Sequence, residues 1–178
     1  TSEAKAAFGN GDVYIEKFVT SLRHIEAQIL RDTHGNTLVV GLRDCSVQRN
    51  NQKLMEESSS TMLPEKLKKQ VFEYANKIAN AVDYIGAGTV EFIYDVPNDA
   101  VYFMEMNTRL QVEHPVTEVV TGVDIVKQQF EIASGGSIKG LKVVENGYAL
   151  EIRVNAEKAV LDADGKVCAS WNGDPRSP

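Results

Sequence analysis

Residues 89–106 constrain the fold of this chain more than any other stretch. Two segments rich in Val, Phe, Tyr and Ile, at 89–95 and 100–106, flank the turn-forming triplet Pro-Asn-Asp at 97–99. Such segments on either side of such a turn predict two antiparallel strands joined as a hairpin. The chain is therefore expected to contain an antiparallel sheet, and the hairpin decides which side chains face each other.

The register of this hairpin brings two carboxylates together. If Val96 faces Ala100 across the turn, counting back along both strands places Glu91 directly opposite Glu105. Opposed side chains on antiparallel strands lie about 5 Å apart, and like charges there destabilise the pair. A divalent cation removes that repulsion, and Mg²⁺ takes one or two protein carboxylates while keeping other positions for water and phosphate oxygens. The hairpin therefore predicts a magnesium site.

Polar side chains continue at every second position after this pair. They are Glu105, Asn107, Arg109, Gln111 and Glu113. With a period of two, all of them would share one face of a strand. A solvated strand face usually mixes Lys, Glu and Thr, whereas this order of carboxylates, amides and a guanidinium suits an anion held beside a cation.

The other segments predict short strands and helices without an internal repeat. Alternating apolar and polar residues predict strands at 12–18, 24–32, 37–43 and 148–155. Apolar residues at helical spacing predict a helix over 64–84, with Pro64 in its first turn, and a second over 124–133, with Asp124 as N-cap. The fold class is therefore α+β, with a mainly antiparallel sheet and flanking helices.

The composition excludes two classes of partner. With 25 acidic and 19 basic residues and a net charge of −6, the chain lacks the basic surface that nucleic acid requires. No run of 18 apolar residues is present, so no membrane partner is expected. Cys45 and Cys168 are too few for a disulfide framework, and the N-terminal residues have no secretory pattern. We expect a piece of a longer soluble protein in the cytoplasm, or in the mitochondrial matrix if the source is eukaryotic.

Residues 104–118, Met-Glu-Met-Asn-Thr-Arg-Leu-Gln-Val-Glu-His-Pro-Val-Thr-Glu, resemble the signature of biotin carboxylases, the ATP-grasp components of biotin-dependent carboxylases. The resemblance covers about residues 3–157, with further matching stretches at 43–49, 86–91, 121–124 and 151–157. So long a match is far more specific than a lone glycine motif. It implies an incomplete ATP-grasp-like fold. Residues 1–140 would be the C-terminal part of the ATP-grasp domain, and residues 141–178 the start of the C-terminal domain with a truncated or divergent tail.

The resemblance assigns the polar stretch to one active site. The metal ligands that it implies, for one or two Mg²⁺ or Mn²⁺ ions, are Glu91, Glu105 and Asn107. The bicarbonate-binding groups are Lys53, Arg109, Gln111 and the backbone of Val112. The catalytic residues are Arg109, Glu113, Lys53 and Arg153. Among these, Glu113 would be the base that activates bicarbonate, and Arg153 would stabilise the enolate of biotin.

Seven further residues match nucleotide-binding positions of the family. They are Glu16, Lys17, Val19, His24, Gln48, Asn51 and Ile93. Three have a structural alternative, because an Ile in a strand is ordinarily core and a lone His or Lys is ordinarily a surface group. The family usually has Arg-His where this chain has Asn50-Asn51, so amides replace a cation and an imidazole at the nucleotide contact.

The implied reaction is the ATP-dependent carboxylation of biotin. Bicarbonate attacks the γ-phosphoryl group of ATP to give carboxyphosphate, which breaks down to carbon dioxide and phosphate, and the phosphate then deprotonates biotin. The implied partners are ATP, bicarbonate, biotin on a carrier domain or protein, and a carboxyltransferase component, in a homo-oligomeric parent. The family's glycine-rich phosphate loop has no counterpart in this sequence, so the chain alone is not expected to turn over ATP.

Two other functions remain open at this point. A non-catalytic ATP-grasp remnant could bind nucleotide or a partner protein, although its unneutralised acidic residues would then cost stability. A carbamoyl-phosphate-synthetase-like ligase would share the phosphorylation of bicarbonate. The continuation Gln-Val-Glu-His-Pro at 111–115 favours a biotin carboxylase over that ligase.

Overall fold

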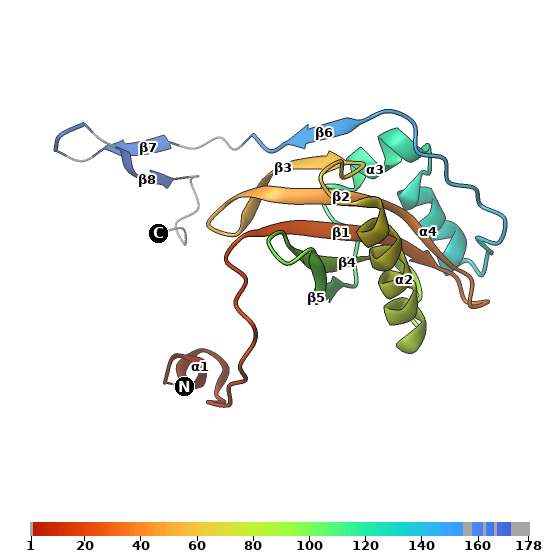
Figure 1. Cartoon of the computed structure of the whole chain (residues 1–178), viewed down its shortest axis with the longest axis horizontal. Coiled ribbons are helices and arrows are strands. Elements are labelled where there is room, and N and C mark those ends of the chain that lie inside the picture. Colours follow the sequence, from red (N-terminus) through yellow and green to blue (C-terminus); the bar gives the residue numbers. More distant parts are fainter. Residues whose placement is uncertain (1, 155–157, 162, 166, 172–178) are drawn as a thin grey trace.

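The computed structural model describes residues 2–154, 158–161, 163–165 and 167–171 (Figure 1). Along these residues the helices are α1 (Ser2–Phe8), α2 (Glu65–Ala81), α3 (His114–Thr121) and α4 (Ile125–Ala133). The strands are β1 (Leu22–Arg31), β2 (Thr37–Arg49), β3 (Gln52–Ser58), β4 (Gly86–Asp95), β5 (Ala100–Asn107), β6 (Ala149–Ile152), β7 (Lys158–Leu161) and β8 (Val167–Trp171). The predicted α+β class is confirmed.

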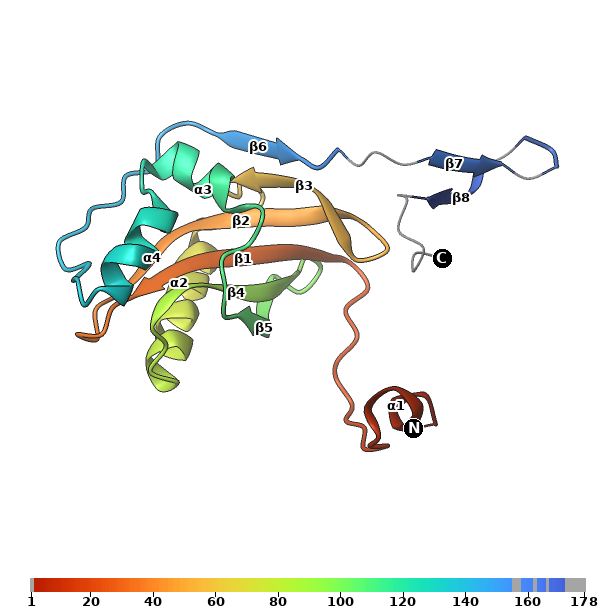
Figure 2. The same ribbon diagram turned by 180° about the vertical axis from the view of Figure 1, so that it is seen from behind.

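The first six strands form one antiparallel sheet in the order β5-β4-β1-β2-β3-β6. β7 and β8 pair with each other in a separate antiparallel hairpin. Figures 1 and 2 show that hairpin and α1 lying apart from the sheet. α2 covers one face of the sheet, while α3 and α4 contact the strands from the other. The predicted, mainly antiparallel sheet with flanking helices is therefore confirmed.

An apolar stripe of α2 forms the core on the first face. Its buried side chains recur every four residues and share one side of the helix: Leu67, Val71, Ala75 and Ala79. They pack against alternate residues of β1, namely Ile25, Ala27 and Ile29. Full burial of a Leu, Val or Ile side chain contributes about 1.5–3 kcal/mol. The helix is shorter than predicted, because Pro64 is its N-cap and Val82 its C-cap.

A smaller apolar cluster occupies one end of the second face. Ile125 and Ile132 of α4 pack there against Leu30, Val40 and Ala87 of the sheet. The Asp124 side chain accepts a hydrogen bond of 2.7 Å from the backbone N–H of Lys127, so its predicted role as N-cap is confirmed. The rest of this face, beyond the cluster, is lined by polar side chains.

The β4–β5 hairpin reaches the predicted pairing by a different route. Asp95, not Val96, pairs with Ala100, so the turn is one residue longer than predicted. A β-bulge between Glu91 and Phe92 then shifts the register by one residue. Glu91 therefore still stands opposite Glu105, because the longer turn and the bulge compensate for each other.

Three sequence-based predictions of regular structure were wrong or incomplete. Residues 12–18 are not a strand, and their apolar side chains, such as Tyr14 and Ile15, stay exposed because no strand among the described residues pairs with them. β3 was not predicted, and β2 extends to Arg49 rather than ending at residue 43. Of the predicted strand at 148–155, residues 149–152 form β6, and residue 155 lies outside the described residues.

The turn between β2 and β3 explains the Asn-Asn pair. Asn50 and Asn51 have φ angles of 51° and 64°, and Arg49 pairs with Gln52 on either side of them. A two-residue hairpin with both central φ values positive favours Asn and Gly, because other side chains are strained there. The two amides therefore suit the turn itself. None of the helices among the described residues is long and apolar enough to cross a membrane.

Candidate active site

One line of residues crosses the polar part of the sheet from β2 to β5. Arg43 stands opposite Glu26, which stands opposite Glu91. Glu91 in turn stands opposite Glu105. Three carboxylates therefore lie side by side on neighbouring strands, where like charges repel. Glu26 and Glu91 are buried and need cationic partners inside the protein, whereas Glu105 is exposed.

Lys53 of β3 neutralises the centre of this line. Its Nζ atom contacts Glu26 Oε1 and lies 3.0 Å from Glu91 Oε1. It also lies 2.7 Å from Oε1 of Glu113, which belongs to the segment between β5 and α3. One ammonium group thus joins three carboxylates from three parts of the chain. The predicted catalytic pair of Lys53 and Glu113 is in direct contact.

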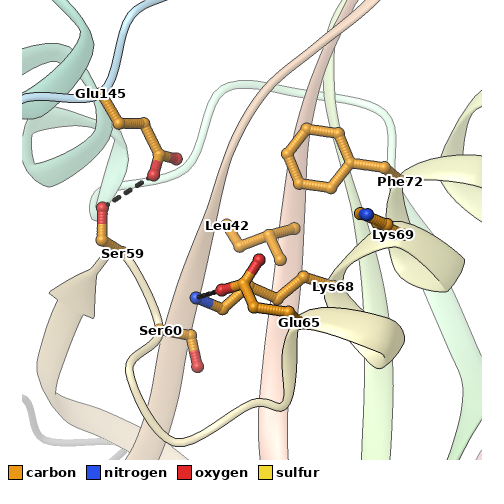
Figure 3. Close-up of a pocket in the computed structure, with 8 residues that line it drawn as sticks. All are labelled: Leu42, Ser59, Ser60, Glu65, Lys68, Lys69, Phe72 and Glu145. Atoms are coloured by element: carbon orange, nitrogen blue, oxygen red, sulfur yellow. Dashed lines mark hydrogen bonds and ion pairs between the residues drawn. The ribbon is translucent and has the colours of Figure 1, made fainter.

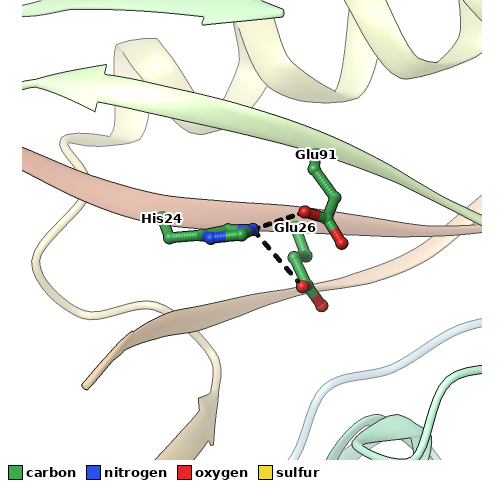
Figure 4. A group of neighbouring side chains, drawn as sticks. All are labelled: His24, Glu26 and Glu91. Carbon is green, nitrogen blue, oxygen red and sulfur yellow. Dashed lines mark ion pairs between the residues drawn. The ribbon is translucent and has the colours of Figure 1, made fainter. Parts of the chain in front are cut away.

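The His24 ring of β1 faces the carboxylates of Glu91 and Glu26, as Figure 4 shows. Its Nε2 atom lies 2.7 Å from Glu91 Oε2 and 3.5 Å from Glu26 Oε1. The Gln48 side-chain amide lies 2.9 Å from Nδ1 of the same ring. If Gln48 donates to Nδ1, the proton of a neutral ring is on Nε2 and faces the carboxylates.

The Arg43 side chain connects several polar side chains on the second face of the sheet. Its guanidinium is fully buried, and it donates to Glu26 Oε2 at 3.0 Å. Its other donors meet side-chain oxygens 2.7–3.2 Å away, on Gln28, Thr89, Gln111 and Thr117. A planar fork of five donors suits so many acceptors at fixed angles. Arg43 therefore fixes Gln111, whose amide donates to Glu91 Oε1 at 2.8 Å.

The surroundings keep the site's groups charged. Burial alone would raise the pKa of Glu91, but the contacts with His24, Lys53 and Gln111 outweigh it and hold that pKa well below its usual range. Burial alone would lower the pKa of Lys53, but Glu26 and Glu113 outweigh it and raise that pKa. Glu91 is therefore a carboxylate and Lys53 an ammonium at neutral pH.

Cys45 belongs to the same surroundings but has no nucleophilic role. Its thiol is fully buried and lies within 4.8 Å of carboxylate oxygens of Glu26 and Glu113. Burial, and then the charge of Glu26, raise the pKa of this thiol well above its usual range. A thiol that stays protonated is a poor nucleophile.

A hollow of about 330 Å³ opens above the line of carboxylates. It brings together nine predicted site residues: His24, Gln48, Asn51, Lys53, Glu91, Glu105, Asn107, Arg109 and Gln111. Arg109 is exposed, and among the described residues its guanidinium donates only to the neighbouring Leu110 carbonyl, at 3.3 Å. Val112 is also exposed. The metal and bicarbonate positions predicted from the sequence thus border one open space, apart from Val112.

The alternating strand predicted over residues 105–113, which was expected to bring these side chains together, was wrong in part. β5 ends at Asn107, and residues 108–113 are irregular, so the polar residues beyond that point do not alternate along a strand. α3 begins directly afterwards, at His114, and was not predicted. Gln111 and Glu113 are buried because this irregular segment folds back over the sheet towards Arg43 and Lys53.

Arg153 approaches the site from beyond the end of β6. Its Nη2 atom donates to Glu113 Oε2 at 2.7 Å, on the carboxylate whose other oxygen meets Lys53. Burial would raise the pKa of Glu113, but the hydrogen bond from Lys53 and the charges nearby lower it. The predicted catalytic residues Lys53, Glu113 and Arg153 therefore form one connected chain, and Arg109 lies apart from it.

The predicted nucleotide residues divide between two hollows. A second one, of about 300 Å³, is lined by Glu16, Lys17, Val19, Ile93, Tyr102, Phe103 and Met104. Met104 also borders the first hollow. The Lys17 ammonium lies 3.1 Å from Asp95 Oδ2 and 2.8 Å from the Tyr102 hydroxyl, so this lysine is paired with the sheet.

A third hollow, of about 400 Å³, lies by the α2 face and has a different character (Figure 3). Its charges pair within its own wall, since Lys68 lies 2.7 Å from Glu65. The Ser59 hydroxyl likewise donates to Glu145 at 2.9 Å. The described residues bring no group of carboxylates together on it as they do around Lys53, so the candidate active site is placed on the polar face.

The donor set at the hairpin fits a magnesium ion. Asn107 Nδ2 donates to Glu91 Oε1 at 2.8 Å, which leaves the Oδ1 atom of that amide available. Among the described residues, no hydrogen bond or ion pair of Glu105 is found, although it faces Glu91 across the strands. Two carboxylates and an amide oxygen beside an open space are the hard oxygen ligands that Mg²⁺ takes.

The sequence analysis missed two residues that organise the site, Glu26 and Arg43. A signal for Glu26 was present, because His24, Glu26 and Gln28 place a polar group at every second position of β1. That pattern resembles a solvated strand face. Only the cover formed by α3 and residues 108–113 makes these positions buried, and that cover was not predicted.

Comparison with known proteins places the chain in a family. A family model described as the ATP-binding domain of the carbamoyl-phosphate synthase L chain matches residues 1–141. The chain belongs to this family. Among its relatives, biotin carboxylase 1 of Bacillus subtilis (strain 168) is 55% identical over 157 residues, which are 87% of this chain and 35% of that protein. The chain thus spans about a third of the length of the curated relatives that it matches.

Solved structures of family members agree with the fold. A biotin carboxylase–β-γ-ATP complex from Campylobacter jejuni is 48% identical with a TM-score of 0.83, over 89% of this chain and 35% of that one. The biotin carboxylase domain of Hydrogenobacter thermophilus 2-oxoglutarate carboxylase, in complex with MgADP, ADP and bicarbonate, is 47% identical with a TM-score of 0.80, over 88% and 35%. The predicted resemblance and the predicted ATP-grasp-like fold are confirmed.

Proposed function

We propose that this chain supplies the magnesium-binding and bicarbonate-binding part of a biotin carboxylase. The observation that carries the proposal is the line of Glu26, Glu91 and Glu105, neutralised at its buried end by Arg43 and Lys53 and open at Glu105. Structural relatives in complex with a nucleotide, and in one case with bicarbonate, support it.

Glu91, Glu105 and Asn107 are the proposed ligands of Mg²⁺ or Mn²⁺. The metal would neutralise the phosphate oxygens of ATP and clamp the transferring phosphoryl group. His24 and Gln111 hold the Glu91 carboxylate in place from two sides. The chain's own contribution is thus a preformed, charged ligand, which needs no rearrangement of the buried strands.

Bicarbonate is proposed to bind between Arg109, Gln111, the backbone N–H of Val112 and Lys53. The exposed fork of Arg109 has donors to spare for an oxyanion. Glu113 is proposed as the base that takes the bicarbonate proton, and its lowered pKa keeps it ionised for that task. The activated oxygen then attacks the γ-phosphoryl group of ATP, the bond between the γ-phosphorus and the β-phosphate oxygen breaks, and carboxyphosphate and ADP form, as in the family.

The second hollow is proposed to hold the adenine end of ATP, against Ile93 and the segment with Glu16, Lys17 and Val19. His24, Gln48 and Asn51 border the space towards the phosphates. Biotin on a carrier is proposed to enter beside Arg153, and a carboxyltransferase would take its carboxyl group. We also propose that residues 1–140 belong to the ATP-grasp domain and 141–178 to the next domain. The end of the family match at residue 141 supports this boundary.

The test uses the full-length protein that contains this chain. We expect ATP hydrolysis that requires both biotin and bicarbonate. Arg109→Ala and Glu113→Ala should each lower the rate by about 10²–10³, as the loss of one preorganised group typically does. Lys77→Ala on the exposed side of α2 is the matched control and should leave the rate unchanged.

Three outcomes separate the alternatives. Normal turnover in both active-site variants would overturn the proposal. Hydrolysis that requires bicarbonate but not biotin would favour a carbamoyl-phosphate-synthetase-like ligase. Binding of MgATP without any turnover would favour a non-catalytic remnant.

A further inference from the structure

Glu56 of β3 is a buried carboxylate that the proposed mechanism does not use. It is fully buried, and neither of its side-chain oxygens accepts a hydrogen bond from the described residues. Leaving a polar group buried without such a partner costs stability, so an apolar residue would serve the core better. What Glu56 does meet is a charge, because its Oε1 atom lies 2.8 Å from Nε of Arg153.

Arg153 is held between two carboxylates. Its Nε edge faces Glu56, and its Nη2 atom faces Glu113 at 2.7 Å. The backbone N–H of Arg153 also donates to the Leu54 carbonyl at 2.9 Å, which ties it to β3 beyond the end of β6. The guanidinium is therefore anchored on its buried edge by a group that takes no other part in the site.

A second carboxylate stands directly across from Glu56. Glu151 of β6 is its cross-strand partner, and Glu151 Oε2 is also buried, with no hydrogen-bond partner among the described residues. Two opposed carboxylates are costly to ionise together. Burial raises the pKa of each, and their neighbour Glu113 adds to that effect, while Arg153 opposes it. The charges of His114 and Arg43 also oppose it at Glu151.

We propose that Glu56 is a positioning residue, which holds the Nε edge of Arg153 so that its Nη groups stay aimed at the anionic substrate. This inference rests on the proposed function. When a substrate oxygen displaces Glu113 from Nη2, the contact with Glu56 keeps the guanidinium in place. Glu151 brings a second negative charge close to Glu56, so removing the Glu151 carboxylate would make Glu56 easier to ionise.

The first experiment measures biotin-dependent turnover of the full-length protein. Glu56→Ala should lower kcat by about 10- to 100-fold, the loss expected for one buried charge-assisted contact, with KM for ATP unchanged. Glu56→Asp should recover part of the rate. Glu57→Gln is the matched control, because the next residue of β3 points away and meets Arg23 instead.

The pH dependence of kcat distinguishes a positioning role of Glu56 from a merely structural one. At low pH the Glu56–Glu151 pair gains protons and releases Arg153, so kcat should fall on the acid side. Glu151→Gln removes the neighbouring negative charge, so this acid limb should move to lower pH. If the acid limb of the kcat profile lies at the same pH in Glu151→Gln as in the wild type, and Glu56→Ala keeps the wild-type kcat, the inference is overturned.

An NMR measurement on the 178-residue chain does not depend on turnover. The Nε–H signal of Arg153 should exchange slowly with water in the wild type and quickly in Glu56→Ala. A parent without biotin-dependent hydrolysis would refute the proposed function, whereas slow exchange in both forms would refute the anchoring role of Glu56. The thermal midpoint of Glu56→Met should change little, because Arg153 keeps its contact with Glu113 and an apolar side chain suits the buried position.

Discussion

The two faces of β1 are equally buried and chemically opposite. Ile25, Ala27 and Ile29 face α2, while Glu26 and Gln28 point to the other side, and all of them are fully buried. On the α2 face, burial itself stabilises the fold. On the other face, burial is tolerated only because Arg43 and Lys53 meet each oxygen that the strand presents. The α2 face therefore carries stability, and the polar face carries chemistry at a cost in stability.

Among the variants that test this difference between the two faces, Arg43→Met should lose the most stability. Removing one partner of a buried ion pair typically costs about 3–5 kcal/mol, and here Glu26 Oε2 loses its cation while Lys53 meets only Oε1. The free energy of unfolding from urea titration should fall by that amount. Lys77→Met, in an exposed pair on α2, is the control and should change little. A small loss in Arg43→Met would mean that the polar face does not depend on its buried cation.

A second effect concerns a buried carboxylate remote from the site. Asp32, after β1, accepts from the backbone N–H groups of His34, Asn36 and Ile138, each at 2.9 Å. Although burial would raise its pKa, these hydrogen bonds and those from the Asn36 and Ser137 side chains hold that pKa well below its usual value of 3.8.

Since the folded-state pKa of Asp32 is depressed, its contribution is present above pH 3.8 and is lost as the pH falls. Asp32→Asn should cost about 2–3 kcal/mol at pH 7, and the difference from the wild type should shrink towards pH 2. Urea titrations across this range measure it. A difference that is the same at every pH would contradict the depressed pKa of Asp32. The acid sensitivity of the fold would then come from the polar face of the sheet alone.

A third effect tests the α2 face by itself. Ile29→Val removes one buried methylene group and should cost about 0.5–1.5 kcal/mol. Because no charge changes, the loss should be equal at pH 4 and pH 7, and Mg²⁺ affinity should stay at the wild-type value. If Mg²⁺ affinity changes as well, the two faces of β1 are coupled and cannot be treated as separate.

The smallest effect is expected at the turn beside the polar face. Asn51 has a φ of 64°, which glycine adopts without strain, so Asn51→Gly should change the unfolding free energy by no more than about 0.5 kcal/mol. Asn51→Val should cost more, because a β-branched residue is strained there. Equal stability of the two variants would argue against the left-handed turn. Comparing the ATP affinity of Asn51→Gly with the wild type then isolates the contribution of the amide.

Prediction succeeded where the pattern was local. The hairpin at 89–106 and the capped helix after Asp124 were found because turn residues, caps and periodicity act over a few neighbours. It failed at residues 12–18, where alternation was present but no strand was available as a partner. It also treated 105–113 as one strand, although the chain turns at Asn107 and starts α3 at His114.

The sequence by itself determined the chemistry that is available to the site. The acidic residues of β4 and β5 and the amides and arginine after them are legible because alternation and a hairpin's register are local properties. Lys53 was assigned only through the family resemblance. Only the tertiary structure decided that Glu26 and Arg43 are buried partners and that Glu113 meets Lys53 and Arg153. Those contacts join residues from distant parts of the chain. Which charges end up without water depends on how α3 and residues 108–113 fold over the sheet, and no local pattern encodes that cover.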